Sequence, residues 1–305
     1  MAVEMKHNHL NEETQNIMKK SKKTKLAWCR KDHFISYGKA EKTLRYLEWV
    51  ISQPQEPNTD LDSISIIGAS GMGKTTIVKK FQDDHNSELN LGDAEQHIVA
   101  HCVLPDADLG LKGMYVSILQ AKPFHYPVSV ERMKSYSVIQ LEKACVNLLK
   151  QTGVRILFVD EIQHALSRRI ETTLNSLKRV VLLSGVPLVP VGTEKAKEVF
   201  LLDEQLADRC PTKSFSELKG WKNDIELRKF LAGYEKYLPF PKPSNLSSTK
   251  ISREIFALCI DKKINGTINL RRVSRLLKAV SAMALRENAD CININYLTKY
   301  QEEFL

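Results

Sequence analysis

The stretch SISIIGASGMGKTTIVKKF, residues 63–81, decides the fold of this chain. A short apolar run from Ile64 to Ile67 stops at a glycine, and a helical pattern begins at Lys74 and Thr75. The segment between them, GASGMGKT, has the spacing G-x-x-x-x-G-K-[ST]. It lies after a strand and before a helix, which is the context that a phosphate-binding loop requires. The sequence therefore predicts a nucleotide phosphate site here.

The chemistry of such a loop gives its residues separate tasks. Gly68 and Gly73 let the backbone wrap a phosphate without Cβ clashes. The loop N–H groups and the helix N-terminus supply donors and positive potential. We expect Lys74 to reach the β- and γ-phosphates and the Thr75 hydroxyl to bind Mg²⁺. Other loop residues expected at the nucleotide are Ser70, Gly71 and Thr76.

A pair of acids follows a second apolar strand in ILFVDEIQHAL, residues 156–166. Asp160 ends that strand, where ligands bind in open α/β sheets, and we expect it to hold Mg²⁺ through water. Glu161 is expected to orient and deprotonate the attacking water. Two adjacent acids also suit a plain helix N-cap, which is the alternative interpretation.

Strand and helix patterns alternate through the first two thirds of the chain. Apolar strand patterns occur at 63–68, 97–105, 154–161 and 186–193. Short apolar strands separated by helices predict a parallel sheet covered on both sides. After about residue 216 only helical patterns follow, so we expect a small helical domain there. The predicted parts are a basic N-terminal extension, a nucleotide-binding α/β domain and a helical domain, at 1–30, 31–215 and 216–305.

Composition further restricts the class of protein to which this chain can belong. The 305 residues are 43% hydrophobic and 27% charged, as in an ordinary globular protein, with a formal net charge of +9. The basic balance suits a polyanion as partner, although many basic proteins bind no nucleic acid. No apolar run is long enough to span a membrane, and the polar N-terminus does not resemble a secretory signal. The six cysteines form no CxxC pair, which favours a reducing cytoplasm.

A metal site at His97, His101 and Cys102 is not expected. On a strand, residues four apart lie on one face but about 13 Å from each other, at roughly 3.3 Å per residue. Zinc–nitrogen bonds are about 2 Å long, so the two histidines cannot bind one ion.

Two further residues are candidates for catalysis. Thr193 follows the strand in PLVPVGTEKAKE, residues 187–198, and its hydroxyl could position the attacking water. Gly-Thr is also a common turn. Arg209 ends a short helix after that strand, and an arginine offered to a neighbouring subunit's nucleotide stabilises transition-state charge. Its alternative role is a surface salt bridge.

Seven segments in fixed order resemble the TniB/TnsC family of bacterial transposon AAA+ ATPases, over roughly residues 31–300. They are ISYGKAEKTLRYLE, GASGMGKTTIVKKFQDDH, ILFVDEIQHAL, PLVPVGTEKA, QLADR, LPFPKPSNL and GTINLRRVSRLLKAV. The phosphate loop and the acid pair occur in many ATPases. The ISY before the first helix, IQHAL after the acids and KPSNL in the helical part are much narrower signals.

The resemblance implies a P-loop AAA+ αβα sandwich with a parallel sheet and a C-terminal helical lid. It implies an ATPase that uses ATP and Mg²⁺ and assembles on duplex DNA as a ring of six or seven subunits or as a helical filament. Such proteins connect a TniQ-like target selector to a TnsB/TniA-like DDE transposase in the bacterial cytoplasm. ATP hydrolysis is expected to disassemble or proofread the assembly.

Carried over by position, the resemblance assigns roles to residues of this chain. Walker A is Gly68, Gly73, Lys74 and Thr75, and Walker B is Asp160 and Glu161. Sensor 1 is Thr193, and the arginine finger is Arg209. Ile35 and Tyr37 are expected to line the adenine. Sensor 2 is Arg271 or Arg272, and the sequence does not choose between them.

No sequence motif predicts which residues contact DNA. Rings of this kind contact DNA phosphates without recognising the base sequence, so we expect basic side chains on the inner face of the ring to contribute to DNA binding. The candidates lie between the second strand and the Walker B strand, and each has solvated charge as its alternative. They are Lys112, Lys122, Arg132 and Lys134.

Two other functions remain open. One is a nucleotide-gated DNA-binding scaffold in which hydrolysis is slow and incidental; the complete Walker B acids and Arg209 argue against a dead site. The other is a replication initiator or helicase-loader ATPase. Such proteins usually add a winged-helix domain, for which the helical patterns after residue 216 leave little room.

Overall fold

The computed structural model describes residues 8–59, 61–86, 99–105, 110–124, 126–166, 170–260 and 266–304. It forms two compact units. The α/β unit is residues 39–218, and the helical unit combines residues 1–38 with 219–305. The N-terminal residues thus group with the helical C-terminal part. The domain boundaries at 30 and 215 remain a prediction, because a packing unit is not by itself an independently folding domain.

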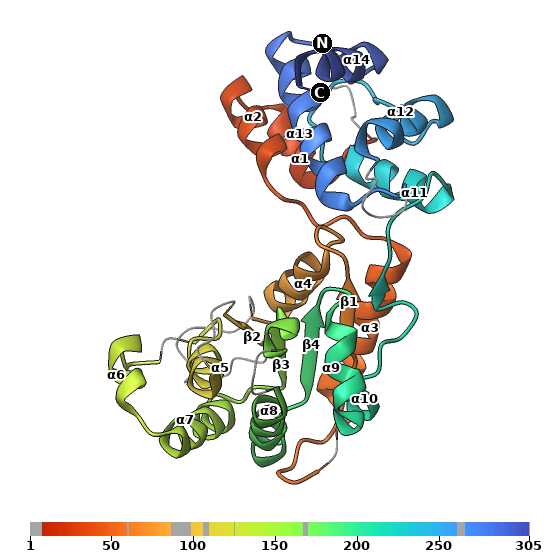
Figure 1. The fold of residues 1–305 in the computed structure, drawn as a ribbon. Coiled ribbons are helices and arrows are strands. Elements are labelled where there is room, and N and C mark those ends of the chain that lie inside the picture. Colours follow the sequence, from red (N-terminus) through yellow and green to blue (C-terminus); the bar gives the residue numbers. More distant parts are fainter. Residues whose placement is uncertain are drawn as a thin grey trace. The chain divides into compact units, whose positions relative to one another are not determined.

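The α/β unit is built on a parallel sheet of five strands in the order β2-β3-β4-β1-β5 (Figure 1). The strands are β1 Ile66–Gly68, β2 Val99–Val103, β3 Ile156–Asp160, β4 Leu188–Gly192 and β5 Glu217–Leu218. Strands β1, β3 and β4 are buried along their whole length, which explains their continuous apolar sequences. The predicted parallel sheet is confirmed.

The sequence patterns missed strand β5, which follows the last predicted strand at 186–193 and ends close to the expected limit of about residue 216. It is only two residues long and pairs with β1, with Ile67 opposite Glu217 and Gly68 opposite Leu218. A Cβ added to Gly68 would lie 2.4 Å from the Leu218 carbonyl oxygen, so only glycine permits this close approach. A two-residue strand is too short to leave a periodic pattern in the sequence.

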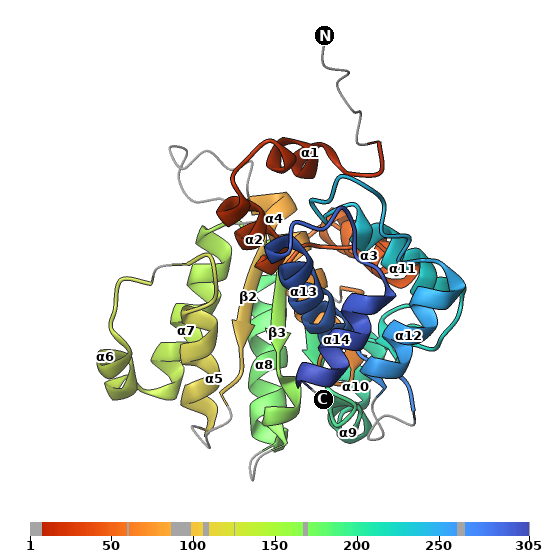
Figure 2. The same ribbon diagram turned by 90° about the horizontal axis from the view of Figure 1, so that it is seen from above.

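Helices cover both faces of the sheet. They are α3 Gly38–Ser52, α4 Lys74–Asn86, α5 Gly110–Leu119, α6 Val130–Ser135, α7 Val138–Gln151, the 3₁₀ helix η1 Ile162–Ala165, α8 Ile170–Ser184, α9 Ala196–Leu202 and α10 Glu204–Arg209. Helices α5, α7 and α8 pack together on one face (Figures 1 and 2). Helices α3 and α4 lie side by side, joined by the pair His85–Glu48 at 3.1 Å.

Alternation along β3 decides which face each side chain occupies, since successive strand residues point to opposite faces. Leu157 and Val159 belong to the core beneath α5, α7 and α8. Phe158 points the other way and packs edge-on against Phe81 of α4, with ring centroids 6.0 Å apart. Asp160 is in phase with Phe158, so the sequence period itself directs its carboxylate toward the α4 face.

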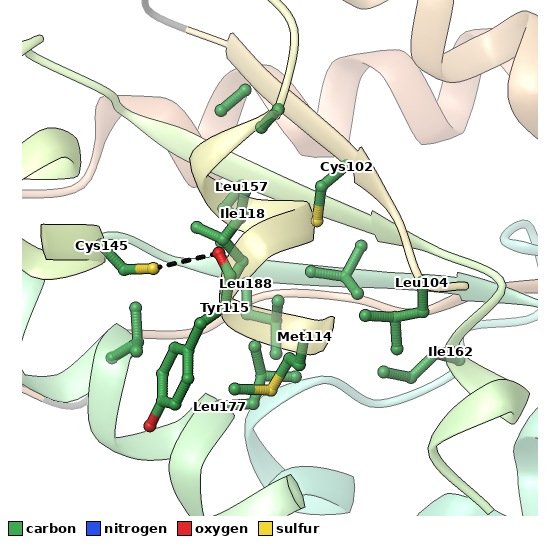
Figure 3. Close-up of a cluster of buried hydrophobic side chains, with 14 of the residues drawn as sticks. Cys102, Leu104, Met114, Tyr115, Ile118, Cys145, Leu157, Ile162, Leu177 and Leu188 are labelled. Carbon is green, nitrogen blue, oxygen red and sulfur yellow. Dashed lines mark hydrogen bonds between the residues drawn. The ribbon is translucent and has the colours of Figure 1, made fainter. Parts of the chain in front are cut away.

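The core beneath α5, α7 and α8 contains three of the six free cysteines, Cys102, Cys145 and Cys210, and Figure 3 labels the first two. Cys102 and Cys145 lie among Met114, Tyr115 and Leu157, and the Cys145 thiol donates to the Tyr115 carbonyl oxygen at 3.3 Å. Five cysteines are buried in all, whereas Cys291 is partly exposed. In the part of the chain that the structure describes, no helix is long and apolar enough to cross a membrane.

The helical unit is organised around α13. Its helices are α1 Glu12–Met18, α2 Lys22–Arg30, α11 Ile225–Glu235, α12 Thr249–Cys259, α13 Leu270–Arg286 and α14 Ile294–Phe304. Val273, Leu277, Val280 and Ala284 recur every three or four residues along α13 and are fully buried. Helices α2, α12 and α14 all pack on α13.

Specific contacts attach the N-terminal segment to this unit. The Trp28 indole N–H donates to the Tyr237 carbonyl oxygen at 3.0 Å, and the His33 ring stacks on Tyr237 with centroids 4.7 Å apart. Lys278 of α13 pairs with Asp32. The described residues of the predicted N-terminal extension therefore include a helix, α2, that packs within the helical unit.

Candidate functional site

The loop between β1 and α4 has the backbone form that its glycines permit. Gly71 and Gly73 have φ of 81° and 92°, in the region that glycine adopts without strain. Lys74 is 7% exposed, and its ammonium donates to the Gly68 and Ala69 carbonyl oxygens at 2.7 and 3.1 Å. The buried Lys74 ammonium thus lies against the loop that is predicted to bind a phosphate. Ser70 lies within this loop and Thr76 in the first turn of α4.

The predicted Mg²⁺ ligands lie beside each other. The Thr75 hydroxyl donates to the Asp160 carboxylate, with Oγ1 and Oδ2 3.1 Å apart. Burial alone raises the pKa of Asp160, but the His101 imidazole, the Glu161 N–H and the Thr75 hydroxyl outweigh burial and bring this pKa below its usual value. A hydroxyl next to an ionised carboxylate is a hard oxygen donor set that fits Mg²⁺ completed by phosphates and water.

Glu161 adopts an uncommon backbone conformation. Its φ and ψ are 58° and 39°, in the left-handed region that non-glycine residues rarely occupy. Glu161 occupies the N-cap position of η1, yet its side chain makes no capping hydrogen bond. Strain of this kind persists where the surrounding structure imposes it, often at functional sites. The carboxylate is not used as a helix cap, so the N-cap alternative has no support in the geometry.

Gln163 joins the acid pair to the neighbouring strand end. Its amide nitrogen donates to a Glu161 carboxylate oxygen, and its amide oxygen accepts from the Thr193 backbone N–H at 3.1 Å. A Cβ added to Gly192 would lie 2.6 Å from the same amide oxygen, so the glycine makes room for it. Sequence reasoning missed Gln163. Its position two residues after Glu161, on a single turn, is the signal that could have indicated it.

His101 is a second residue that the predictions did not include. It pairs with Phe158 across β2 and β3, so its side chain lies on the same face as Asp160. Its Nε2 is 3.7 Å from an Asp160 oxygen, beyond hydrogen-bond distance, and among the described residues this buried nitrogen has no hydrogen-bond partner. His97 lies outside the described residues.

Arg209 lies at the other end of β1 from the phosphate loop. The Ser63 N–H donates to the Arg209 carbonyl oxygen at 2.9 Å, and Ser63 precedes Gly68 by five residues, about 16 Å of extended chain. The structure therefore brings Thr75, Asp160 and Glu161 together at the carboxyl end of the sheet and leaves Arg209 at the amino end.

The predicted adenine residues belong to the helical unit. Ile35 is 5% exposed and packs at Gly233 of α11, where an added Cβ would lie 2.9 Å from Ile35 Cγ2. Tyr37 packs edge-on against Trp221 with centroids 5.0 Å apart. Within the part of the chain that the structure describes, the buried Tyr37 hydroxyl has no hydrogen-bond partner, and burial raises its pKa. An orphaned buried hydroxyl is costly, which fits a group that a ligand completes.

The two sensor 2 candidates begin α13 and are both exposed. Arg272 donates from its guanidinium to the Ile260 carbonyl oxygen at 2.8 Å, at the C-terminal end of α12. This contact gives Arg272 a structural role, but it does not exclude Arg272 from a nucleotide site. The choice between Arg271 and Arg272 stays open.

The four basic candidates for DNA contact lie around α5 and α6 of the α/β unit. The Lys112 ammonium donates to the Lys134 carbonyl oxygen at 3.0 Å, which brings these two together. Lys122, Arg132 and Lys134 are exposed.

A family model described as "Bacterial TniB protein" matches residues 25–223. The chain belongs to the TniB family. The TniB match includes the phosphate loop, the acid pair, Thr193 and Arg209, and it confirms the family that the sequence motifs indicated. Among curated protein sequences, none matches.

Solved structures with the same fold are distant in sequence. The ORC2 protein of Aeropyrum pernix, solved as ADPNP–ADP complexes, is 19% identical and has a TM-score of 0.62, covering 90% of this chain and 71% of that chain. The Aeropyrum pernix ORC1 protein in complex with DNA is 17% identical, with a TM-score of 0.57 and coverage of 90% and 66%.

The Holliday junction branch migration motor RuvB of Thermotoga maritima is 21% identical, with a TM-score of 0.52 and coverage of 90% and 72%. At these identities the similarity establishes the fold alone. The TniB chain has the P-loop AAA+ ATPase fold with a helical C-terminal part, as predicted.

Proposed function

We propose that this TniB-family chain is an ATPase that regulates DNA transposition by assembling on duplex DNA in its ATP-bound form. The observation that carries the proposal is the 3.1 Å contact between Thr75 and Asp160, because it joins the phosphate loop to the acidic strand end. Nucleotide complexes are known for the structurally similar ORC2 protein, which supports ATP as the ligand.

The residues divide the hydrolysis between them. Lys74 and the loop N–H groups bind the phosphates, and Thr75 with Asp160 would hold Mg²⁺, which neutralises charge on the phosphate oxygens. Glu161 takes a proton from the water that attacks the γ-phosphorus, while the bond to the β–γ bridging oxygen breaks. Gln163 and Thr193 lie where they can fix the orientation of Glu161 and the water.

Arg209 supports assembly with further copies of the chain. Its position at the amino end of β1 suits contact with a neighbouring subunit's nucleotide rather than its own. Such an arrangement links turnover to a ring of six or seven subunits or to a helical filament. The DNA complex of the structurally similar ORC1 protein supports duplex DNA as the partner.

We propose two further partners, which the resemblance of the sequence motifs to this family implies. A TniQ-like target selector and a TnsB/TniA-like DDE transposase are the proteins that the assembly would connect. Binding of each to DNA-bound assemblies, and not to the free chain, is the expected pattern.

The test is imaging of the purified chain with duplex DNA by negative-stain electron microscopy. Rings or filaments are expected with a non-hydrolysable ATP analogue and not with ADP. At a limiting concentration of the analogue, Lys74→Ala should form fewer of them than the wild type, whereas Lys79→Ala, an exposed lysine on the same helix, should not. Monomers under every condition, with ATP still bound, would refute assembly as the function.

A nucleotide-gated scaffold is the remaining alternative, and turnover separates it from an ATPase switch. ATP hydrolysis that rises with DNA and with protein concentration supports the switch. Flat, negligible hydrolysis with intact assembly supports the scaffold. An initiator or helicase loader would instead bind replication proteins, and the ORC similarity at 19% identity speaks only for the fold.

A further inference from the structure

The two units of the chain differ sharply in charge. The helical unit has 24 Lys and Arg against 13 Asp and Glu, a formal charge of +11. The α/β unit has 21 against 23, a formal charge of −2. The whole net positive charge of the protein therefore belongs to the helical unit.

Part of that charge is neutralised locally. Lys229 pairs with Glu226 at 3.0 Å, Lys242 with Asp290 at 2.8 Å, and Lys299 with Glu287. These lysines have carboxylates beside them, so they attract an external anion weakly.

The segment from Lys19 to Lys31 is different. It contains seven Lys and Arg residues and no Asp or Glu. Lys23, Ala27 and Arg30 are exposed and lie four and three residues apart, on one face of α2. The opposite face carries the buried Cys29 and packs on α13.

We define the α2 basic stripe as Lys20, Lys23 and Arg30. Lys20 is exposed and lies just before the N-cap Ser21. Among the residues that the structure describes, no carboxylate lies within ion-pair distance of any of the three. Lysines beside a helix N-terminus also oppose the helix dipole, so helix stability does not explain this placement.

Lys22 adds a rigid anchor beside the stripe. Its ammonium donates to the Arg286 carbonyl oxygen at 2.6 Å and to Asn288 Oδ1 at 2.9 Å. This contact fixes the start of α2 against the end of α13 and brings the exposed Arg286 next to the stripe. The cations are thus presented by packed helices rather than by a loose tail.

We propose that the α2 basic stripe, with Arg286 beside it, is a surface through which this chain contacts the phosphates of duplex DNA. The proposal rests on the DNA-binding function proposed above and assigns it to the helical unit. Lysines act as point charges without the planar fork that reads a base edge, so a lysine-rich surface suits sequence-independent backbone contact.

The experiment compares two triple variants that each remove three positive charges. Lys20→Gln/Lys23→Gln/Arg30→Gln removes the stripe and leaves the Lys22 anchor intact. Lys42→Gln/Lys143→Gln/Lys150→Gln removes three exposed cations of the α/β unit that have no proposed role, as the matched control. Binding to a random-sequence duplex is measured by fluorescence anisotropy, with a non-hydrolysable ATP analogue present, between 50 mM and 300 mM salt.

The stripe variant should bind on the order of 100-fold more weakly at low salt, and its slope of log affinity against log salt should fall by about 2 to 3, since each phosphate contact contributes roughly 0.9. The control variant should bind like the wild type. Unchanged thermal unfolding and ATP affinity of both variants establish that neither is misfolded.

Two results overturn the proposal. One is a stripe variant that binds with wild-type affinity and slope; the other is a control variant that alone loses binding, which would locate the contact in the α/β unit. Failure of the wild type itself to bind duplex DNA would refute the proposed function instead, so the two failures are distinguishable.

Discussion

The α/β unit and the helical unit differ in how their formal charge relates to the anion that each is proposed to bind. The α/β unit is predicted to bind a multiply charged nucleotide, yet its formal charge is −2. The helical unit has a charge of +11 and contains no phosphate-loop motif. A compact anion needs a few aligned N–H groups and one or two buried cations, such as Lys74. A long polyanion instead needs many exposed charges along its length.

Net charge alone therefore points to the wrong unit for nucleotide chemistry. The +9 of the whole chain is consistent with DNA binding, but it gives no location. Only the division into packing units separates the two roles, and four substitutions test that separation.

The largest expected effect is on turnover in the α/β unit. Glu161→Gln should lower the ATP hydrolysis rate by on the order of 1,000-fold, because the amide cannot accept the proton from water. Affinity for ATP and for DNA should persist, since neither uses that carboxylate. A coupled phosphate-release assay measures the rate, with Glu198→Gln, an exposed acid on α9, as the control. Wild-type hydrolysis by the Glu161 variant would refute its role as base.

The next effect tests whether the two units are energetically separate. Leu277 is fully buried in α13, and Leu277→Ala should lower the free energy of unfolding of the helical unit by about 3 kcal/mol. Amide hydrogen exchange should accelerate in α2 and α13 while β1 and β3 keep their protection. Leu157→Ala, at a fully buried position of β3, should give the reverse pattern. Equal acceleration in both units would mean that they unfold as one.

A smaller effect is expected at the loop cation. Lys74→Ala should weaken ATP binding by about 10- to 100-fold, as expected for loss of one charge-assisted hydrogen bond. Titration calorimetry measures the change, with Lys79→Ala as the control. The same affinity in both variants would show that Lys74 does not contact phosphate.

The smallest effect concerns the link between Glu161 and Thr193. Gln163→Leu keeps the approximate volume but removes both hydrogen bonds, and it should lower kcat about tenfold with little change in KM. Gln163→Glu keeps the length but loses the donor and repels Glu161, so it should lower kcat at least as much. Full activity of Gln163→Glu would contradict a positioning role for this side chain.

The sequence predicted the parts of the fold that rest on period and spacing. The strands around Phe158 and Val189 are continuous apolar runs, and the loop of Gly68 to Thr75 has fixed spacing, so their order and layers followed from local rules. The parallel sheet, the helical C-terminal part and the TniB family are all confirmed. The roles of the individual site residues remain predictions.

The rest depended on contacts between residues far apart in the chain. Gln163 reaches Thr193 only because β3 and β4 are neighbours, and neighbouring strands cannot be read from one strand's pattern. Strand β5 forms because β1 offers an open edge beside Gly68. The grouping of Trp28 with Tyr237 joins segments about two hundred residues apart, which no local pattern records.

The six thiols differ in reactivity because five are buried and one is partly exposed. Burial raises the pKa of Cys29, Cys102, Cys210 and Cys259 to about 12 and also raises that of Cys145. Only the thiolate reacts readily with alkylating reagents, so these five thiols should stay inert near neutral pH. Cys291, partly exposed between α13 and α14, is then the single labelling position of the native chain. A maleimide dye there would mark the helical unit alone, without any engineered cysteine.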